Sequence, residues 1–133
     1  HINTTKLLEL VAPQKDVDGF HPFNVGRLTT GLDGFVPCTP LGVMELLKEY
    51  SIDVKGKNCV VVGASNIVGK PMASLLLNAH ATVEICHLCT DDLKRHTLNA
   101  DIILVGVGVI NLIKEDMVKD DTIIIDIGIN RAD

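Results

Sequence analysis

A glycine-containing turn at residues 62–71, with the sequence VGASNIVGKP, carries the clearest chemical signal in this chain. It follows the apolar run of residues 58–62 and opens a helical pattern, which is the context that a dinucleotide-binding turn requires. Gly63 permits a tight turn, Ser65 stands where such turns usually have a second glycine, and Gly69 would let the helix pack closely on a sheet. The helix N-terminus would then offer free N–H groups to a phosphate. An ordinary strand–turn–helix, in which glycine only makes the turn, is the competing interpretation.

Two further glycine-containing turns follow apolar runs, at residues 105–108 and 127–130. Because ligands of open α/β sheets bind outside the carboxyl ends of the strands, three such turns together favour a bound nucleotide cofactor. The tip of the second expected strand, residues 85–88, has neither the acidic side chain that usually holds the ribose hydroxyls of NAD nor an arginine for the 2′-phosphate of NADP. The turns therefore predict a nucleotide site and leave the choice of cofactor open.

Two aspartates, Asp16 and Asp18, lie two residues apart in a glycine-containing loop just before Phe20. A carboxylate can accept paired N–H donors from a heterocycle in charge-assisted hydrogen bonds, so this loop is a candidate substrate site. A solvated turn, with Asp16 as a cap, is the competing interpretation.

The pair Cys86 and Cys89 has the spacing of a zinc-binding or redox motif. Zinc needs four ligands, a second pair at suitable spacing is missing, and His87 between the two cysteines cannot easily complete the set. Cys59 lies within an apolar run, where a thiol behaves as a small hydrophobic side chain. The cysteines therefore indicate a reduced chain with structural thiols.

The first forty residues differ in texture from the rest. Residues 3–10 have the spacing of a short helix, whereas residues 13–40 are rich in glycine and proline and are expected to form a long ordered loop or a domain junction. Thr39 is expected to cap the helix that follows, with Pro40 at its first position.

From residue 58 onward, apolar runs alternate with helical patterns. Strands are expected at residues 58–62, 82–86, 101–105 and 122–127, and helices at residues 67–77, 91–98 and 114–118. Each strand is a short, continuous apolar run, which is typical of strands buried on both faces of a parallel sheet. The alternation predicts an α/β fold with a Rossmann-like, doubly wound parallel sheet.

The composition excludes several classes of protein. The 133 residues carry a net charge of −5 and only 3% aromatic side chains, all of which precede residue 51. A nucleic-acid-binding role is therefore not expected, because it needs clustered cations and aromatic stacking platforms. No apolar run approaches the roughly 20 residues of a membrane-spanning helix. We expect a cytoplasmic chain that binds neither nucleic acid, nor membrane, nor metal.

Four segments together resemble the signatures of the bacterial bifunctional methylenetetrahydrofolate dehydrogenase/methenyltetrahydrofolate cyclohydrolase family. They are residues 15–20 (KDVDGF), 37–40 (PCTP), 62–71 (VGASNIVGKP) and 126–130 (DIGIN). The resemblance covers essentially the whole chain, with the motifs in the order and spacing of the family. It implies a two-domain α/β enzyme, usually a homodimer. Such an enzyme oxidises 5,10-methylenetetrahydrofolate with NADP and then hydrolyses the methenyl product to 10-formyltetrahydrofolate.

By position, the resemblance assigns Asp18 to the pterin ring of the folate. It assigns five residues to the cofactor: Gly63, Ala64, Ser65, Leu88 and Ile129. Some members of the family have arginine at the position of Ala64, and many have a hydroxyl or basic side chain at the position of Leu88. Because Ala64 and Leu88 both lack a side-chain group that could bind the 2′-phosphate of NADP, NAD is the alternative cofactor.

The resemblance also implies a catalytic lysine four residues after a tyrosine, on a helix ahead of this chain. Val54 stands four residues after Tyr50, so no catalytic residue is expected within the chain. We interpret the chain as a central fragment: residues 1–37 would end an N-terminal α/β catalytic, folate-binding domain and form the junction, and residues 38–133 would form the NAD(P)-binding domain. A nucleotide-binding module without catalysis of its own is the alternative hypothesis.

Overall fold

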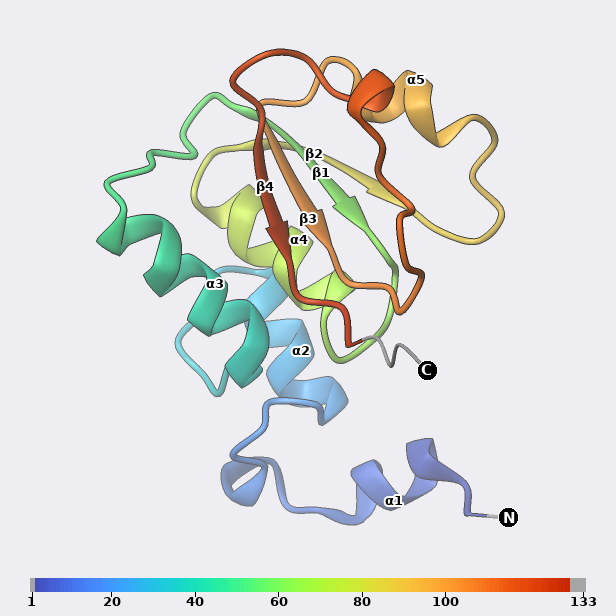
Figure 1. The fold of residues 1–133 in the computed structure, drawn as a ribbon. Helices are drawn as coiled ribbons and strands as arrows, with labels where there is room; N and C mark the ends of the chain where they lie inside the picture. The colour runs from blue at the N-terminus through green and yellow to red at the C-terminus, as the bar shows by residue number, and fades with distance from the viewer. Residues whose placement is uncertain (1, 130–133) are drawn as a thin grey trace.

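Within residues 2–129, which the computed structural model describes, four parallel strands form one sheet in the order β2–β1–β3–β4 (Figure 1). The strands are β1 (Asn58–Val62), β2 (Thr82–Cys86), β3 (Ile102–Val105) and β4 (Ile123–Asp126). β1 pairs with β2 on one side and with β3 on the other, so the chain reverses its winding direction after β2. The predicted parallel sheet is confirmed, and its first two strands have the bounds that the apolar runs predicted.

Helices cover both faces of the sheet, as a doubly wound fold requires. They are α3 (Cys38–Glu49), α4 (Gly69–Asn78), α5 (Leu93–Thr97) and the 3₁₀ helix η2 (Glu115–Met117). Leu47 of α3 and Leu76 of α4 pack on one face. Leu93 of α5 and Val118, just after η2, pack on the other.

The central strands β1 and β3 are buried on both faces, which explains their continuous apolar sequence. Val61 and Leu104 belong to the core on the α3 and α4 side, whereas Val60 and Ile103 belong to the core on the α5 side. All four side chains are at most 2% exposed. Full burial of an aliphatic side chain contributes about 1.5–3 kcal/mol, so these strands are the main source of stability in the sheet.

The short helix predicted at residues 3–10 is confirmed as α1 (Thr4–Leu10). The segment from residue 13 to α3 is not the continuous loop that its glycine and proline content predicted, because it contains the 3₁₀ helix η1 (Pro13–Lys15) and α2 (Pro22–Thr29). Pro22 lacks an N–H that the first turn would leave unused, and the His21 side chain accepts a hydrogen bond from the Phe23 N–H. Leu28 is buried, and the Asn78 side chain on α4 donates to the Leu28 carbonyl at 2.8 Å. Local capping and packing on α4 together stabilise α2 as a helix.

The prediction that Thr39 caps α3 is wrong. The helix begins two residues earlier than predicted, at Cys38 instead of Pro40, and Pro37 precedes it without any side-chain cap. Pro37 already holds its φ at −54°, which lets the helix start directly after it. Pro40 is buried within the first turn.

The remaining helices are short. α5 covers less than the predicted residues 91–98, because Asp92 adopts a left-handed φ of 49° and its carboxylate accepts a hydrogen bond from the Arg95 N–H. The predicted helix at residues 114–118 is a single 3₁₀ turn. In the described part of the chain, no helix combines the length and the apolar character needed to cross a membrane.

Candidate functional site

The glycine turn after β1 lies where the sheet changes its winding direction, between the carboxyl ends of β2 and β3. Ligands of open α/β sheets bind in this crevice. Gly63 has a φ of +118°, and a Cβ there would lie 3.0 Å from the carbonyl oxygen of Gly106. A Cβ on Gly69, the first residue of α4, would overlap the Gly63 carbonyl group. The turn therefore requires glycine at both positions, so that three backbone segments can approach one another.

Ser65 organises the start of α4. Its Oγ accepts hydrogen bonds from the N–H of Val68 at 3.1 Å and from the N–H of Gly69 at 3.3 Å. The helix consequently begins at Gly69, two residues later than the apolar spacing predicted. The Ser65 hydroxyl can still donate its own hydrogen to an anion at the turn.

A cavity of about 350 Å³ opens at the carboxyl ends of β1, β2 and β3. Its lining residues are Val62, Gly63, Ala64, Cys86, His87, Leu88, Thr90, Leu93, Val107, Val109 and Leu112. Three predicted cofactor residues, the adjacent Gly63 and Ala64 and the distant Leu88, therefore meet in one place. The volume and the mostly apolar wall are typical of a small-molecule site.

The tip of β2 forms one wall of this cavity. The N–H of His87 donates to the Thr90 hydroxyl at 2.8 Å, and Nδ1 of His87 accepts the Cys89 N–H at 3.1 Å. These two bonds fold the tip into a tight turn on which Leu88 is fully exposed. His87 and Thr90 line the cavity but were absent from the predicted site. Their place directly after a strand was the available signal.

The cysteine pair at this tip has no redox or metal-binding geometry. Cys86 is buried at the end of β2, Cys89 is exposed, and both thiols are free. Burial raises the pKa of the Cys86 thiol, and the nearby Glu84 carboxylate raises it further, so the reactive thiolate is disfavoured. Among residues 2–129, no group of three or more His, Cys, Asp or Glu side chains could hold a metal ion.

Asp16 fixes the loop that carries Asp18. Asp16 is 6% exposed, and its carboxylate accepts hydrogen bonds from the N–H of Phe20 at 3.2 Å and of His21 at 2.8 Å. It also accepts one from Nδ2 of Asn24, at 2.8 Å. Burial would raise the pKa of Asp16, but the hydrogen bonds from these three groups outweigh it and lower the pKa. Asp16 is thus a buried cap rather than a solvated one, whereas Asp18 is exposed on the loop.

A second cavity, of about 280 Å³, joins the Asp18 loop to the glycine turn. Phe20, two residues after Asp18, lines it from one side, and Asn66, Ile67 and Lys70 line it from the other. In Figure 1 the N-terminal segment lies on the side of the sheet toward which the arrowheads of β3 and β4 point. The structure therefore places the predicted substrate loop beside the predicted cofactor turn.

Three predicted site residues, Ser65, Ile129 and Asp18, do not line the cavity at the strand ends. Ile129 follows β4 and is 89% exposed. Asn130, the last residue of the fourth motif, lies outside the described residues.

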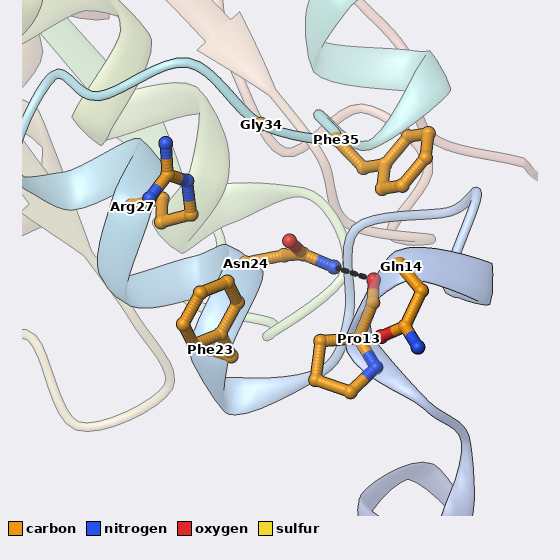
Figure 2. Close-up of a pocket in the computed structure, with 7 residues that line it drawn as sticks. All are labelled: Pro13, Gln14, Phe23, Asn24, Arg27, Gly34 and Phe35. Atoms are coloured by element: carbon orange, nitrogen blue, oxygen red, sulfur yellow. Dashed lines mark hydrogen bonds between the residues drawn. The ribbon is translucent and has the colours of Figure 1, made fainter.

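A third cavity, of about 470 Å³, lies between η1, α2 and the link to α3 (Figure 2). Asn24 donates from Nδ2 to the Pro13 carbonyl at 2.9 Å, so the residue that supports Asp16 also ties η1 to α2. The Arg27 guanidinium lies 5.7 Å from the centre of the Phe23 ring, within range of a cation–π contact. None of the predicted site residues lines this cavity. Sequence reasoning missed Asn24, because its two partners lie eight and eleven residues away.

Comparison with known proteins decides the family. The sequence model of the tetrahydrofolate dehydrogenase/cyclohydrolase NAD(P)-binding domain matches residues 37–133. The chain belongs to this family. The bifunctional protein FolD of Sulfurimonas denitrificans is 85% identical over 132 residues, which are 99% of this chain and 46% of that protein. The chain thus spans about half the length of the curated relatives that it matches.

Solved structures of the tetrahydrofolate dehydrogenase/cyclohydrolase family share the fold. The bifunctional FolD enzyme of Campylobacter jejuni matches with a TM-score of 0.97 and 58% identity, over 99% of this chain and 47% of that one. The FolD enzyme of Trypanosoma brucei, complexed with NADP and an inhibitor, matches with a TM-score of 0.89 and 36% identity, over 96% of this chain and 44% of that one. The matched domain is an NAD(P)-binding one, so family membership favours the interpretation of residues 62–71 as a dinucleotide-binding turn over an ordinary strand–turn–helix.

Proposed function

We propose that this chain is the part of a bifunctional enzyme that binds NADP and one edge of a folate substrate. The whole enzyme would oxidise 5,10-methylenetetrahydrofolate to the methenyl compound and hydrolyse that compound to 10-formyltetrahydrofolate. One observation carries the proposal: Gly63, Ala64 and Leu88 converge on a single cavity at the switch point of the sheet, in a chain whose family is matched through an NAD(P)-binding domain.

The residues around the switch point fit a dinucleotide. Gly63 and Ala64 present backbone without bulky side chains, and the Ser65 hydroxyl can donate to a phosphate. Leu88 would cover the adenosine end, and Ile129, after the last strand, would contact the nicotinamide end. Bound NADP would supply the hydride acceptor, and these residues would position it against the substrate.

Asp18 would hold the pterin ring. Its carboxylate is exposed, so it is available to accept paired N–H donors from the heterocycle. Asp16, buried beneath the same loop, fixes the backbone just after Asp18 through the N–H groups of Phe20 and His21. The cavity shared by Phe20 and Asn66 supports a substrate lying between the loop and the cofactor turn.

We also propose the wider organisation that the family resemblance implies. Residues 1–37 would complete the folate-binding domain and form the junction, and residues 38–133 would form the NAD(P)-binding domain. The position of the buried aliphatic side chains supports this division, since Leu28 and Pro37 are the two such residues among residues 2–37. The whole enzyme would be a cytoplasmic homodimer that binds tetrahydrofolate derivatives.

The test is a folate-dependent assay of the intact protein that contains these residues. We expect reduced nicotinamide to form from 5,10-methylenetetrahydrofolate and NADP, followed by hydrolysis of the methenyl product. Asp18→Asn should lower kcat/KM for the folate by about 10- to 100-fold, because a charge-assisted hydrogen bond contributes about 1.5–3 kcal/mol.

Asp33→Asn is the matched control, because Asp33 is an exposed aspartate in the same N-terminal segment. It should leave kcat/KM unchanged. Formation of reduced nicotinamide without folate dependence would overturn the proposed substrate. Full activity of Asp18→Asn would overturn the proposed role of Asp18 alone.

A further inference from the structure

NAD and NADP differ by one group, the 2′-phosphate on the adenosine ribose. In a Rossmann-like sheet this ribose lies at the tip of the second strand, where a carboxylate selects NAD and an arginine accommodates NADP. In this chain that tip follows β2 and begins at His87. The side chains that it presents to the cavity therefore bear directly on the choice of cofactor.

The tip presents no side chain with a fixed charge to the cavity. Its residues that line the cavity are His87, Leu88 and Thr90. Of all the described residues that line the cavity, none is Lys, Arg, Asp or Glu. A 2′-phosphate at this tip would meet neither a fixed cation to attract it nor a carboxylate to repel it.

His87 brings a hydrogen-bond donor to the tip in the observed arrangement. Its Nδ1 accepts the Cys89 N–H at 3.1 Å, so Nδ1 carries no proton and the ring proton is on Nε2. A neutral imidazole can donate one hydrogen bond equally well to a ribose hydroxyl or to a phosphate oxygen. This arrangement does not distinguish the two cofactors.

The cations nearest in sequence are directed elsewhere. Lys94 on α5 forms an ion pair with Asp116 at 2.7 Å. Lys70 on α4 donates to the Asn66 side chain at 2.7 Å. Arg95, next to Lys94, does not line the cavity. Asp91 and Asp92, which follow the tip, do not line the cavity, and the Asp92 carboxylate accepts the Arg95 N–H.

We propose that the nucleotide site of this chain discriminates little between NAD and NADP, because the tip of β2 lacks the charged side chain that would select either one. The inference rests on the proposed function in that it takes the cavity at the strand ends as the cofactor site. It specifies that this site accepts both NAD and NADP. It also identifies Leu88 as a position at the tip of β2 where an uncharged side chain leaves the two cofactors undistinguished.

Calorimetric titration of the intact protein with NAD⁺ and, separately, with NADP⁺ tests the proposal without relying on turnover. We expect the two dissociation constants to agree within about fivefold, since no charged hydrogen bond separates them. NADP⁺ binding more than about 100-fold tighter than NAD⁺ would overturn the proposal, because that ratio requires a charged partner at the ribose.

A gain-of-selectivity variant locates the effect. Leu88→Arg places a cation on a fully exposed position, so the core is not disturbed. We expect it to tighten NADP⁺ binding relative to NAD⁺ binding by about 10- to 100-fold. Leu77→Arg, which adds the same charge at an exposed leucine outside the cavity, is the matched control and should change neither constant.

The remaining outcomes separate this inference from the proposed function. Equal tightening of both nucleotides by Leu88→Arg would overturn the placement of the ribose at the tip of β2. Failure of both nucleotides to bind would overturn the cofactor site and this inference with it. Normal binding of both nucleotides without folate turnover would overturn the proposed enzyme activity and leave this inference supported.

Discussion

Before α3, the described residues bury two aliphatic side chains, Leu28 and Pro37, and two polar ones, Asp16 and Asn24. From α3 onward apolar burial dominates, and two layers of aliphatic side chains pack on either face of the sheet. The loop that carries Asp18 therefore depends on a few directional hydrogen bonds, whereas the glycine turn depends on close packing.

This difference matters for function because the two regions would bind different partners. A packed sheet holds its strand ends in fixed relative positions, which suits a site built from three separate turns. A loop tied by a buried carboxylate keeps one exposed side chain in place with little apolar surface. Substitutions should consequently act through cavities and overlaps in one region and through unsatisfied polar groups in the other.

The largest effect is expected in the core of the sheet. Leu104→Ala removes a side chain that is 0% exposed between β3 and the helices α3 and α4, so it should cost about 2–5 kcal/mol of the free energy of unfolding. Urea denaturation followed by circular dichroism measures this loss. Ile124→Ala, at a position that is 46% exposed, is the control and should cost much less. Equal losses for the two variants would mean that packing does not dominate this region.

The next effect concerns the glycine turn. Gly69→Ala places a Cβ against the backbone of Gly63, so the turn must shift and about 1–3 kcal/mol of stability should be lost. Nucleotide binding, measured by calorimetry, should weaken as well, because the displaced turn borders the cavity.

Gly42→Ala is the matched control for that substitution. Gly42 lies inside α3, and a Cβ there would meet no atom within 4 Å. The variant should gain about 0.5–1 kcal/mol, because alanine is the better helix former. Similar stability for the two variants would contradict the close approach at Gly69.

An effect of similar size is expected at the buried carboxylate. Asp16→Asn keeps the shape of the side chain, but it replaces one accepting oxygen with a donor, leaving backbone N–H groups at Phe20 or His21 without an acceptor. The loss should be about 1–3 kcal/mol. In the intact enzyme this variant should raise KM for the folate and leave NADP binding unchanged. Weakened NADP binding would instead show that Asp16 supports both regions.

The pH dependence of stability should show the smallest effect. The pKa of Asp16 is lowered from its ordinary value of 3.8, so its contribution is fully present above about pH 3.8 and is lost as the pH falls through the lower, folded-state value. Wild type should therefore lose more stability than Asp16→Asn on acidification below about pH 4. Parallel acid denaturation curves for the two proteins would contradict the lowered pKa.

The strands and the glycine turn were predictable from the sequence. Residues 58–62 and 82–86 form strands with the expected bounds. The first is an apolar run that a central strand buries on both faces, whereas the second is an edge strand and stays mostly exposed. Gly63 and Gly69 likewise follow from local chemistry, because their spacing places a turn between a strand and a helix. Periodicity and glycine are properties of neighbouring residues, so the sequence alone expresses them.

The helix α2 and the full site depended on tertiary structure. α2 packs on α4, where Asn78 donates to the Leu28 carbonyl from fifty residues further along the chain, and the local glycine and proline content gave no sign of it. Ala64 and Leu88 line one cavity only because β2 lies beside β1 in the sheet. Strand order and buried hydrogen bonds join residues distant in sequence, and the free energy of such contacts depends on the whole packed chain.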